Sequence, residues 1–108
     1  MKYILADEIF FENLPKIYQQ IDELISSVDQ LYLTICMDVF NASIAPGVSA
    51  AAYNGIFADA TFLHFYRHIL KSEKLVALDV AEVNPEFDIA ERTARLAASL
   101  VNEWFMIS

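Results

Sequence analysis

Cysteine is almost absent from this sequence, and so are long apolar runs. With one cysteine, Cys36, no internal disulfide can form, which fits a reducing compartment. No apolar run reaches the roughly 18 to 20 residues that span a bilayer, and no basic segment precedes an apolar one at the N-terminus. We therefore expect a soluble, cytoplasmic protein with no membrane partner.

Positive charge is scarce as well. The chain has 7 Lys and Arg against 15 Asp and Glu, a formal net charge of −8, and its basic side chains form no cluster. Because binding to phosphates requires a basic face, we expect no nucleic-acid partner. We interpret the acidic excess as a solvated surface that aids solubility rather than as a binding patch.

Apolar residues, in contrast, are abundant. They make up 56% of the chain and give a mean hydropathy of +0.37, which is high for a soluble domain of 108 residues. A chain of this length forms at most one domain, residues 1–108, with a core large enough to fold. If it is a piece of a larger sheet, apolar surface is left exposed, and we expect a homo-oligomer through that surface.

Three short apolar segments are typical of β-strands, at residues 2–6, 31–37 and 75–81. The last is almost continuously apolar, as in a parallel strand covered on both faces. Segments with helical periodicity separate and follow them. The order βαβαβα predicts a three-layer α/β/α fold with a parallel sheet and right-handed crossovers.

Each helical segment has a recognisable start. Asn13, with Pro15 in the first turn, opens a helix that runs to about residue 27. Asp59 is a suitable cap for a second helix, to about residue 71. Asp88 with Glu91 resembles a capping box at the start of a third helix, which we expect at residues 88–104.

Acidic side chains follow two of the predicted strands. Asp38 lies at the end of the strand at 31–37, and Glu82 follows the strand at 75–81. A carboxylate at a buried strand end is costly unless a cation or hydrogen bonds compensate it, and open α/β sheets bind ligands beyond the carboxyl ends of their strands. We therefore expect one site at this edge, with Cys36 on the same side as Asp38 because strand side chains alternate.

Four segments, in this order, resemble the C-terminal part of the ureohydrolases, the superfamily of arginase, agmatinase and formimidoylglutamase. The resemblance covers nearly the whole chain. It implies an arginase-like fold, hydrolysis of linear amidine C–N bonds, and two manganese ions in the full-length enzyme. The segments are Cys-Met-Asp at 36–38, Ala-Pro-Gly-Val-Ser-Ala at 45–50, Asp-Val-Ala-Glu-Val-Asn-Pro at 79–85 and Arg-Thr-Ala-Arg at 92–95.

The resemblance also implies roles for the strand-end residues. Asp38 would be a metal ligand, and Glu82 would hold the planar amidinium group of the substrate through two hydrogen bonds. The alternative for both is a carboxylate that stabilises a turn. Cys36 stands where the family has a second Asp; as a metal ligand its thiolate would favour zinc over manganese. An unliganded buried thiol is the interpretation of Cys36 that we favour.

The family's other metal ligands, a His and an Asp-x-His-x-Asp motif, are missing from this sequence. His64 and His68 match no ligand position, and we interpret this i, i+4 pair as part of a solvated helix face. We therefore expect a C-terminal fragment that is inactive alone and need not bind metal by itself. Asp79, inside an apolar strand, is a candidate for a hydrogen bond to the backbone of the long loop at residues 39–58.

Three hypotheses about function remain open. As the resemblance implies, the parent enzyme is expected to hydrolyse the small molecule N-formimidoyl-L-glutamate to L-glutamate and formamide, a step of histidine breakdown. Specificity for arginine or agmatine is an alternative, against which Asn41-Ala42 argues because arginases and agmatinases generally have Asp-Pro there. An inert α/β fragment that self-associates is the third.

Overall fold

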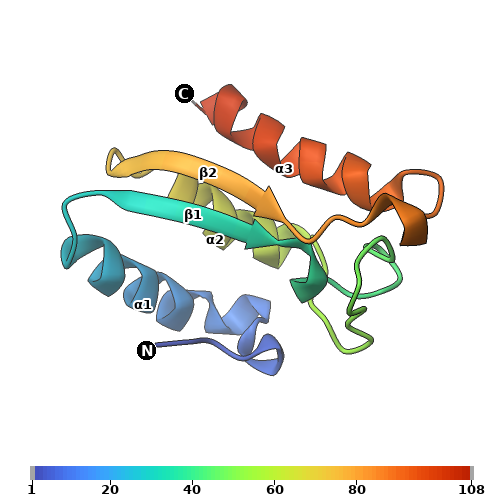
Figure 1. Ribbon diagram of the computed structural model, residues 1–108. Coiled ribbons are helices and arrows are strands. Elements are labelled where there is room, and N and C mark those ends of the chain that lie inside the picture. The colour runs from blue at the N-terminus through green and yellow to red at the C-terminus, as the bar shows by residue number, and fades with distance from the viewer. Residues whose placement is uncertain (1, 108) are drawn as a thin grey trace.

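The computed structural model describes residues 2–107, which form a small parallel sheet packed against helices (Figure 1). In this part of the chain no helix is long and apolar enough to cross a membrane. Short 3-10 turns occur at Ala6–Glu8, Phe11–Asn13, Met37–Val39 and Pro85–Phe87. The regular elements are helix α1 (Leu14–Ser26), strand β1 (Leu31–Cys36), helix α2 (Ala60–Leu70), strand β2 (Leu75–Ala81) and helix α3 (Arg92–Ile107).

The two strands lie side by side and run parallel, joined by a crossover through α2. Leu33 pairs with Leu78, and Cys36 at the end of β1 pairs with Ala81 at the end of β2. Both strands therefore end at the same edge of the sheet, as the sequence predicted. The parallel α/β architecture is confirmed.

The first predicted strand, at residues 2–6, is wrong. Residues 2–5 have no regular structure, and Ala6–Glu8 is a 3-10 turn in which the Leu5 backbone N–H donates to Glu8 Oε1 at 2.9 Å. Among residues 2–107 the sheet consists of β1 and β2 alone, and this segment is not hydrogen-bonded to either. An apolar segment without a pairing partner does not become a strand.

Helix α2 contacts α1 on one side and α3 on the other (Figure 1). The sheet face that bears Ile35 belongs to the core with α2 and α3, whereas Tyr32, Thr34 and Asp79 on the other face are exposed. One helical layer is thus described in residues 2–107, and the second helical layer of the expected three-layer arrangement is not represented in this part of the chain.

Aromatic side chains join the helices to the strand-end loop. Phe62 of α2 lies edge-on to Phe40, with ring centroids 5.2 Å apart, and stacks on Tyr66 at 5.3 Å. The Tyr66 hydroxyl donates to the Leu100 carbonyl of α3 at 2.6 Å, and burial raises the pKa of Tyr66 to about 12. These contacts seal the core between the loop, α2 and α3.

The long loop after β1 is ordered by backbone hydrogen bonds, although it has no helix or strand between residues 40 and 59. The Asn41 N–H donates to the Ile56 carbonyl at 2.7 Å, and the Ile56 N–H donates to the Val39 carbonyl at 3.0 Å. Phe40, Ala45 and Val48 are buried in the main core. The loop therefore belongs to the packed fold.

The start of α2 is as predicted, but the start of α3 is not. Asp59 accepts a hydrogen bond from the Phe62 N–H at 3.0 Å, so it caps α2. Helix α3 begins at Arg92, because Ala90 and Glu91 have φ values of 53° and 58° and insert a left-handed turn after residue 88. The predicted capping box, with Glu91 as its second member, is therefore wrong.

Asp88 nevertheless caps α3 from outside the helix. Its carboxylate accepts hydrogen bonds from the backbone N–H groups of Thr93, at 3.0 Å, and Ala94, at 3.1 Å. Desolvation disfavours ionisation of Asp88, but the N–H groups of Thr93 and Ala94, the Thr93 hydroxyl and the Ile89 N–H outweigh it and lower the pKa of the carboxyl. An ionised carboxylate is what satisfies the free N–H groups of a helix start.

This cap predicts a loss of stability in acid. Because the pKa of Asp88 is lower in the folded chain than in the unfolded one, its contribution is complete above about pH 4 and is lost as the pH falls through the folded pKa. We expect Asp88→Asn to reduce the free energy of unfolding at pH 7 and to make it less dependent on pH between about 5 and 3. Urea unfolding followed by circular dichroism measures both quantities. Asp7→Asn, at an exposed position, is the control, and equal pH dependence of the two variants would contradict the assignment.

Candidate functional site

The candidate site lies at the edge where β1 and β2 end. The chain turns from β1 into the 3-10 turn Met37–Val39, and from β2 directly into Glu82. Because Cys36 and Ala81 are paired, the residues that follow them start from neighbouring positions. This is the edge at which open parallel sheets bind ligands.

Cys36 and Asp38 are in direct contact. The Cys36 thiol donates to Asp38 Oδ1 at 2.8 Å, and both side chains are half-buried. Desolvation and then the hydrogen bond to Asp38 raise the pKa of the Cys36 thiol. The sequence predicted that the two side chains lie on the same side, and they do, but through the 3-10 turn rather than through strand alternation.

Glu82 completes the group at this edge. Its charge contributes to the raised pKa of Cys36, so the carboxylate lies within electrostatic range of the thiol. Its side chain is exposed, and its backbone has a φ of 72°. A non-glycine residue in the left-handed region is disfavoured by roughly 1 to 3 kcal/mol and is concentrated at functional sites. The chain therefore turns sharply away from β2 at Glu82, the residue whose carboxylate is predicted to bind the substrate.

The donors present fit part of a metal site. Zinc and manganese sites use several sulfur, nitrogen or oxygen ligands, and Cys36 with Asp38 supplies one of sulfur and one of oxygen. Among residues 2–107 no group of three or more His, Cys, Asp or Glu side chains could hold a metal ion. Further metal ligands would have to come from outside these residues.

The two histidines lie on α2, outside this group. His68 Nε2 is 2.7 Å from Asp22 Oδ1, and its ring lies 4.7 Å from that of Tyr18, so His68 packs between α1 and α2. The His64 side chain is exposed, with its ring 6.3 Å from the ring of Phe11. The prediction of a solvated face describes His64, but His68 makes a polar contact between helices.

Asp79 is bound differently from the expectation. Its carboxylate accepts a hydrogen bond from the Tyr32 hydroxyl across the exposed face of the sheet, not from the backbone of the long loop. This hydrogen bond, with a smaller effect of burial, raises the pKa of Tyr32. The alternation of side chains along paired strands places both residues on one face, a signal that was available in the sequence.

The turn after Glu82 is held by contacts between motif segments that the sequence did not predict. The Asn84 N–H donates to the Gly47 carbonyl at 2.6 Å, and the Asn84 side chain donates to Ser49 Oγ at 3.1 Å. The Gly47 N–H donates in turn to Thr93 Oγ1 at 2.8 Å. Segments 45–50 and 79–85 were thus recognised as motifs, but their contact with each other was not.

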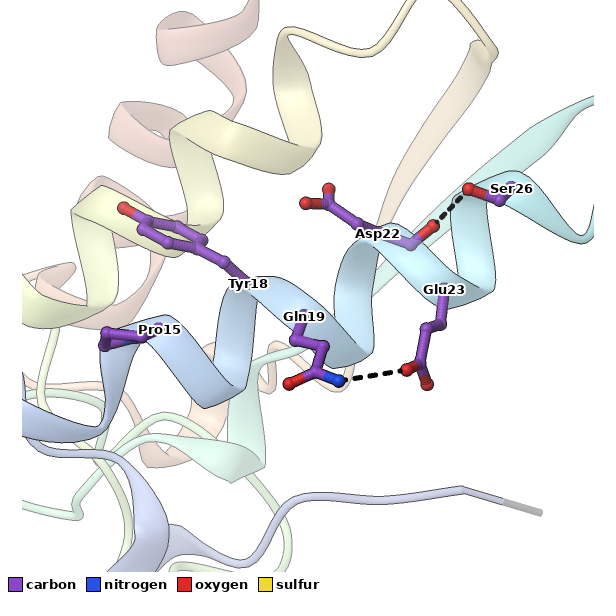
Figure 2. A pocket seen from close by; sticks show the side chains of 6 residues that line it. All are labelled: Pro15, Tyr18, Gln19, Asp22, Glu23 and Ser26. Atoms are coloured by element: carbon purple, nitrogen blue, oxygen red, sulfur yellow. Dashed lines mark hydrogen bonds between the residues drawn. The ribbon is translucent and has the colours of Figure 1, made fainter.

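Two surface hollows differ in their relation to this edge. An apolar groove of about 670 Å³ lies between α1, α2, residues 2–4 and the outer edge of β1, and Cys36 is part of its lining. A more open hollow of about 640 Å³ is formed by α1 residues alone and contains none of the strand-end residues; Figure 2 shows its lining. That lining consists of Pro15, Tyr18, Gln19, Asp22, Glu23 and Ser26.

Comparison with known proteins places this arrangement in a family. The model of the Arginase family matches residues 1–107. Formimidoylglutamase from Staphylococcus carnosus is 42% identical over 104 residues, which are 96% of this chain and 33% of that protein. Formimidoylglutamase from Ralstonia nicotianae is 42% identical over 101 residues, 94% of this chain and 31% of that protein.

Solved structures agree. The crystal structure of formimidoylglutamase from Bacillus subtilis superposes with a TM-score of 0.84 at 25% identity and covers 95% of this chain and 32% of that one. An arginase from Bacillus subtilis gives 0.83 at 23% identity, covering 96% of this chain and 36% of that one. The chain spans about a third of the length of these relatives, and it belongs to the arginase family.

Proposed function

We propose that this chain forms one wall of the active site of an amidine hydrolase that cleaves N-formimidoyl-L-glutamate with water to L-glutamate and formamide. The observation that carries the proposal is Glu82, held at φ 72° at a strand end beside the contact of Cys36 with Asp38. The two formimidoylglutamases at 42% identity support this substrate over arginine or agmatine. The place of the reaction in histidine breakdown and a cytoplasmic location belong to the same proposal.

Each residue at the edge has one task in this proposal. Glu82 accepts two hydrogen bonds from the planar amidinium group and so orients its carbon for attack by water. Asp38, with Cys36 or a substitute ligand, would help to hold the metal pair, for which we propose manganese. The chemistry that such ions supply when bound is activation of water at neutral pH. Since Cys36 and Asp38 are only part of a ligand set, we expect the chain alone to be inactive.

A chimera tests the proposal. The 104 matched residues of the Staphylococcus carnosus enzyme are replaced by this chain, and release of glutamate and formamide is measured with manganese. We expect activity in the chimera and none in the chain alone. Activity on arginine or agmatine instead would show that the proposed substrate is wrong.

Within the chimera, Glu82→Gln tests the amidinium contact. Loss of the charge should lower kcat/KM by about 10- to 100-fold, because hydrogen bonds to charged groups contribute about 1.5 to 3 kcal/mol. Glu86→Gln, at another exposed glutamate four residues on, is the matched control and should retain activity. If the two variants are equally active, Glu82 does not hold the substrate.

Cys36→Asp tests the metal role of the thiol. A carboxylate suits manganese better than a thiolate does, so the manganese dissociation constant of the chimera should fall by about 10-fold, and the preference for zinc should weaken. Titration followed by electron paramagnetic resonance measures the manganese affinity. Cys36→Ser removes the thiol without adding a charge and serves as the control. Equal manganese affinity of Cys36→Asp and Cys36→Ser would show that this position is not a ligand.

We also propose that the isolated chain self-associates through the apolar groove at the outer edge of β1. The groove includes Ile17, Ile21 and Leu24 of α1, and Leu24 is 55% exposed. An unpaired strand edge beside apolar surface favours pairing with another chain. Size-exclusion chromatography with light scattering should show a dimer or larger species.

A charge in the groove should weaken this association. We expect Leu24→Lys to shift the chain towards the monomer, whereas Met106→Lys, at an exposed position of α3 outside the groove, should not. A monomeric wild-type chain at high concentration would contradict the proposal.

A further inference from the structure

One glycine connects the segment after Glu82 to the start of α3. The Gly47 carbonyl accepts the Asn84 N–H at 2.6 Å, and the Gly47 N–H donates to Thr93 Oγ1 at 2.8 Å. Asn84 is two residues beyond Glu82 in the chain. A short path of covalent and hydrogen bonds therefore runs from α3 through Gly47 to the turn that carries the strand-end carboxylate. We call Gly47, Asn84, Asp88 and Thr93 the Gly47 bridge.

The Gly47 bridge leaves no space for a side chain at position 47. A Cβ atom at position 47 would lie 2.5 Å from Cγ of Asp88, so only glycine fits beside this carboxylate. Asp88 is itself fixed, because it accepts the N–H groups of Thr93 and Ala94 at the start of α3. The cap of the helix and the position of Gly47 are thus coupled.

The Thr93 hydroxyl is at the centre of the bridge. Thr93 is completely buried, and its side-chain hydroxyl accepts the Gly47 N–H. Leaving a buried N–H without an acceptor costs its full desolvation free energy, which a methyl group in place of the hydroxyl would impose. A valine has the same shape as threonine and lacks this acceptor.

Asn84 transmits the restraint to the turn. Its backbone N–H is bound to Gly47, its side-chain amide donates to Ser49 Oγ, and its Oδ1 accepts the Glu86 N–H at 3.1 Å. Both the backbone and the side chain of Asn84 are therefore held by hydrogen bonds. The chain between Ala81, held in β2, and Asn84 has to turn within two residues, and Glu82 is the one with a left-handed backbone.

We propose that Thr93 and Asp88 are positioning residues, which keep Glu82 in its left-handed conformation by fixing Gly47 and, through it, Asn84. The role of the positioned carboxylate rests on the proposed function. Neither residue lies at the strand ends, so both act on the site through the bridge. A purely structural role, in which Thr93 only packs α3 on the core, is the alternative.

Hydrogen exchange on the intact chain separates these roles without any need for activity. We expect Thr93→Val to speed exchange of the Gly47 and Asn84 amides by about 10-fold or more, while the amides in the middle of α2 keep their rates. Thr93→Ser retains the hydroxyl and should restore protection at both amides. Leu100→Val removes one buried methylene group from α3 away from the bridge and controls for general loosening.

Kinetics in the chimera tests the link to the substrate. Thr93→Val should raise KM for formimidoylglutamate by about 5- to 10-fold, with a smaller change in kcat, and Thr93→Ser should reverse this. Unchanged exchange at Gly47 and Asn84, or an equal increase throughout α2 and α3, would overturn the positioning role. Local loosening with unchanged KM would overturn the link to Glu82. An inactive chimera would count against the proposed function, and hydrogen exchange would still decide the positioning role.

Discussion

The parallel pairing of β1 with β2 is the constraint on which the candidate site depends. Because Cys36 is paired with Ala81, the Met37–Val39 turn and Glu82 leave the sheet at neighbouring points. A shift of register by one residue would turn every side chain to the opposite face. The core that α2 and α3 form with the sheet fixes that register. Hydrophobic packing therefore determines the geometry of the polar groups at the strand ends, although these groups contribute little to the core.

Much of this fold could be predicted from local sequence. Strands β1 and β2 are apolar runs, and Asp59 is a typical helix cap whose side chain does accept the Phe62 N–H. The elements that were not predicted depend on distant partners. Residues 2–5 are apolar enough for a strand but are paired with neither strand of the described sheet. The start of α3 depends on two left-handed residues that propensity alone does not indicate.

The site was predictable to a similar degree. The nearness of Glu82 to Cys36 follows from strand ends that share an edge. The contact of Cys36 with Asp38 was expected from strand alternation, but the Met37–Val39 turn produces it. The Gly47 bridge does not follow from spacing, since the Gly47 N–H and the Thr93 hydroxyl that accepts it belong to residues 46 positions apart. The only sign of the bridge in the sequence is the glycine at position 47, which is required beside Asp88. A proline–glycine turn accounts for that glycine equally well.

The left-handed backbone at Glu82 has a consequence for how this position can vary. Glycine and asparagine tolerate that conformation better than glutamate does, so backbone energetics alone would favour replacing the acid. The chain thus gives up stability at the point where a carboxylate is useful, a trade-off of stability against function. In a chain released from selection for catalysis, residue 82 is where relaxation towards a less strained residue would be expected first.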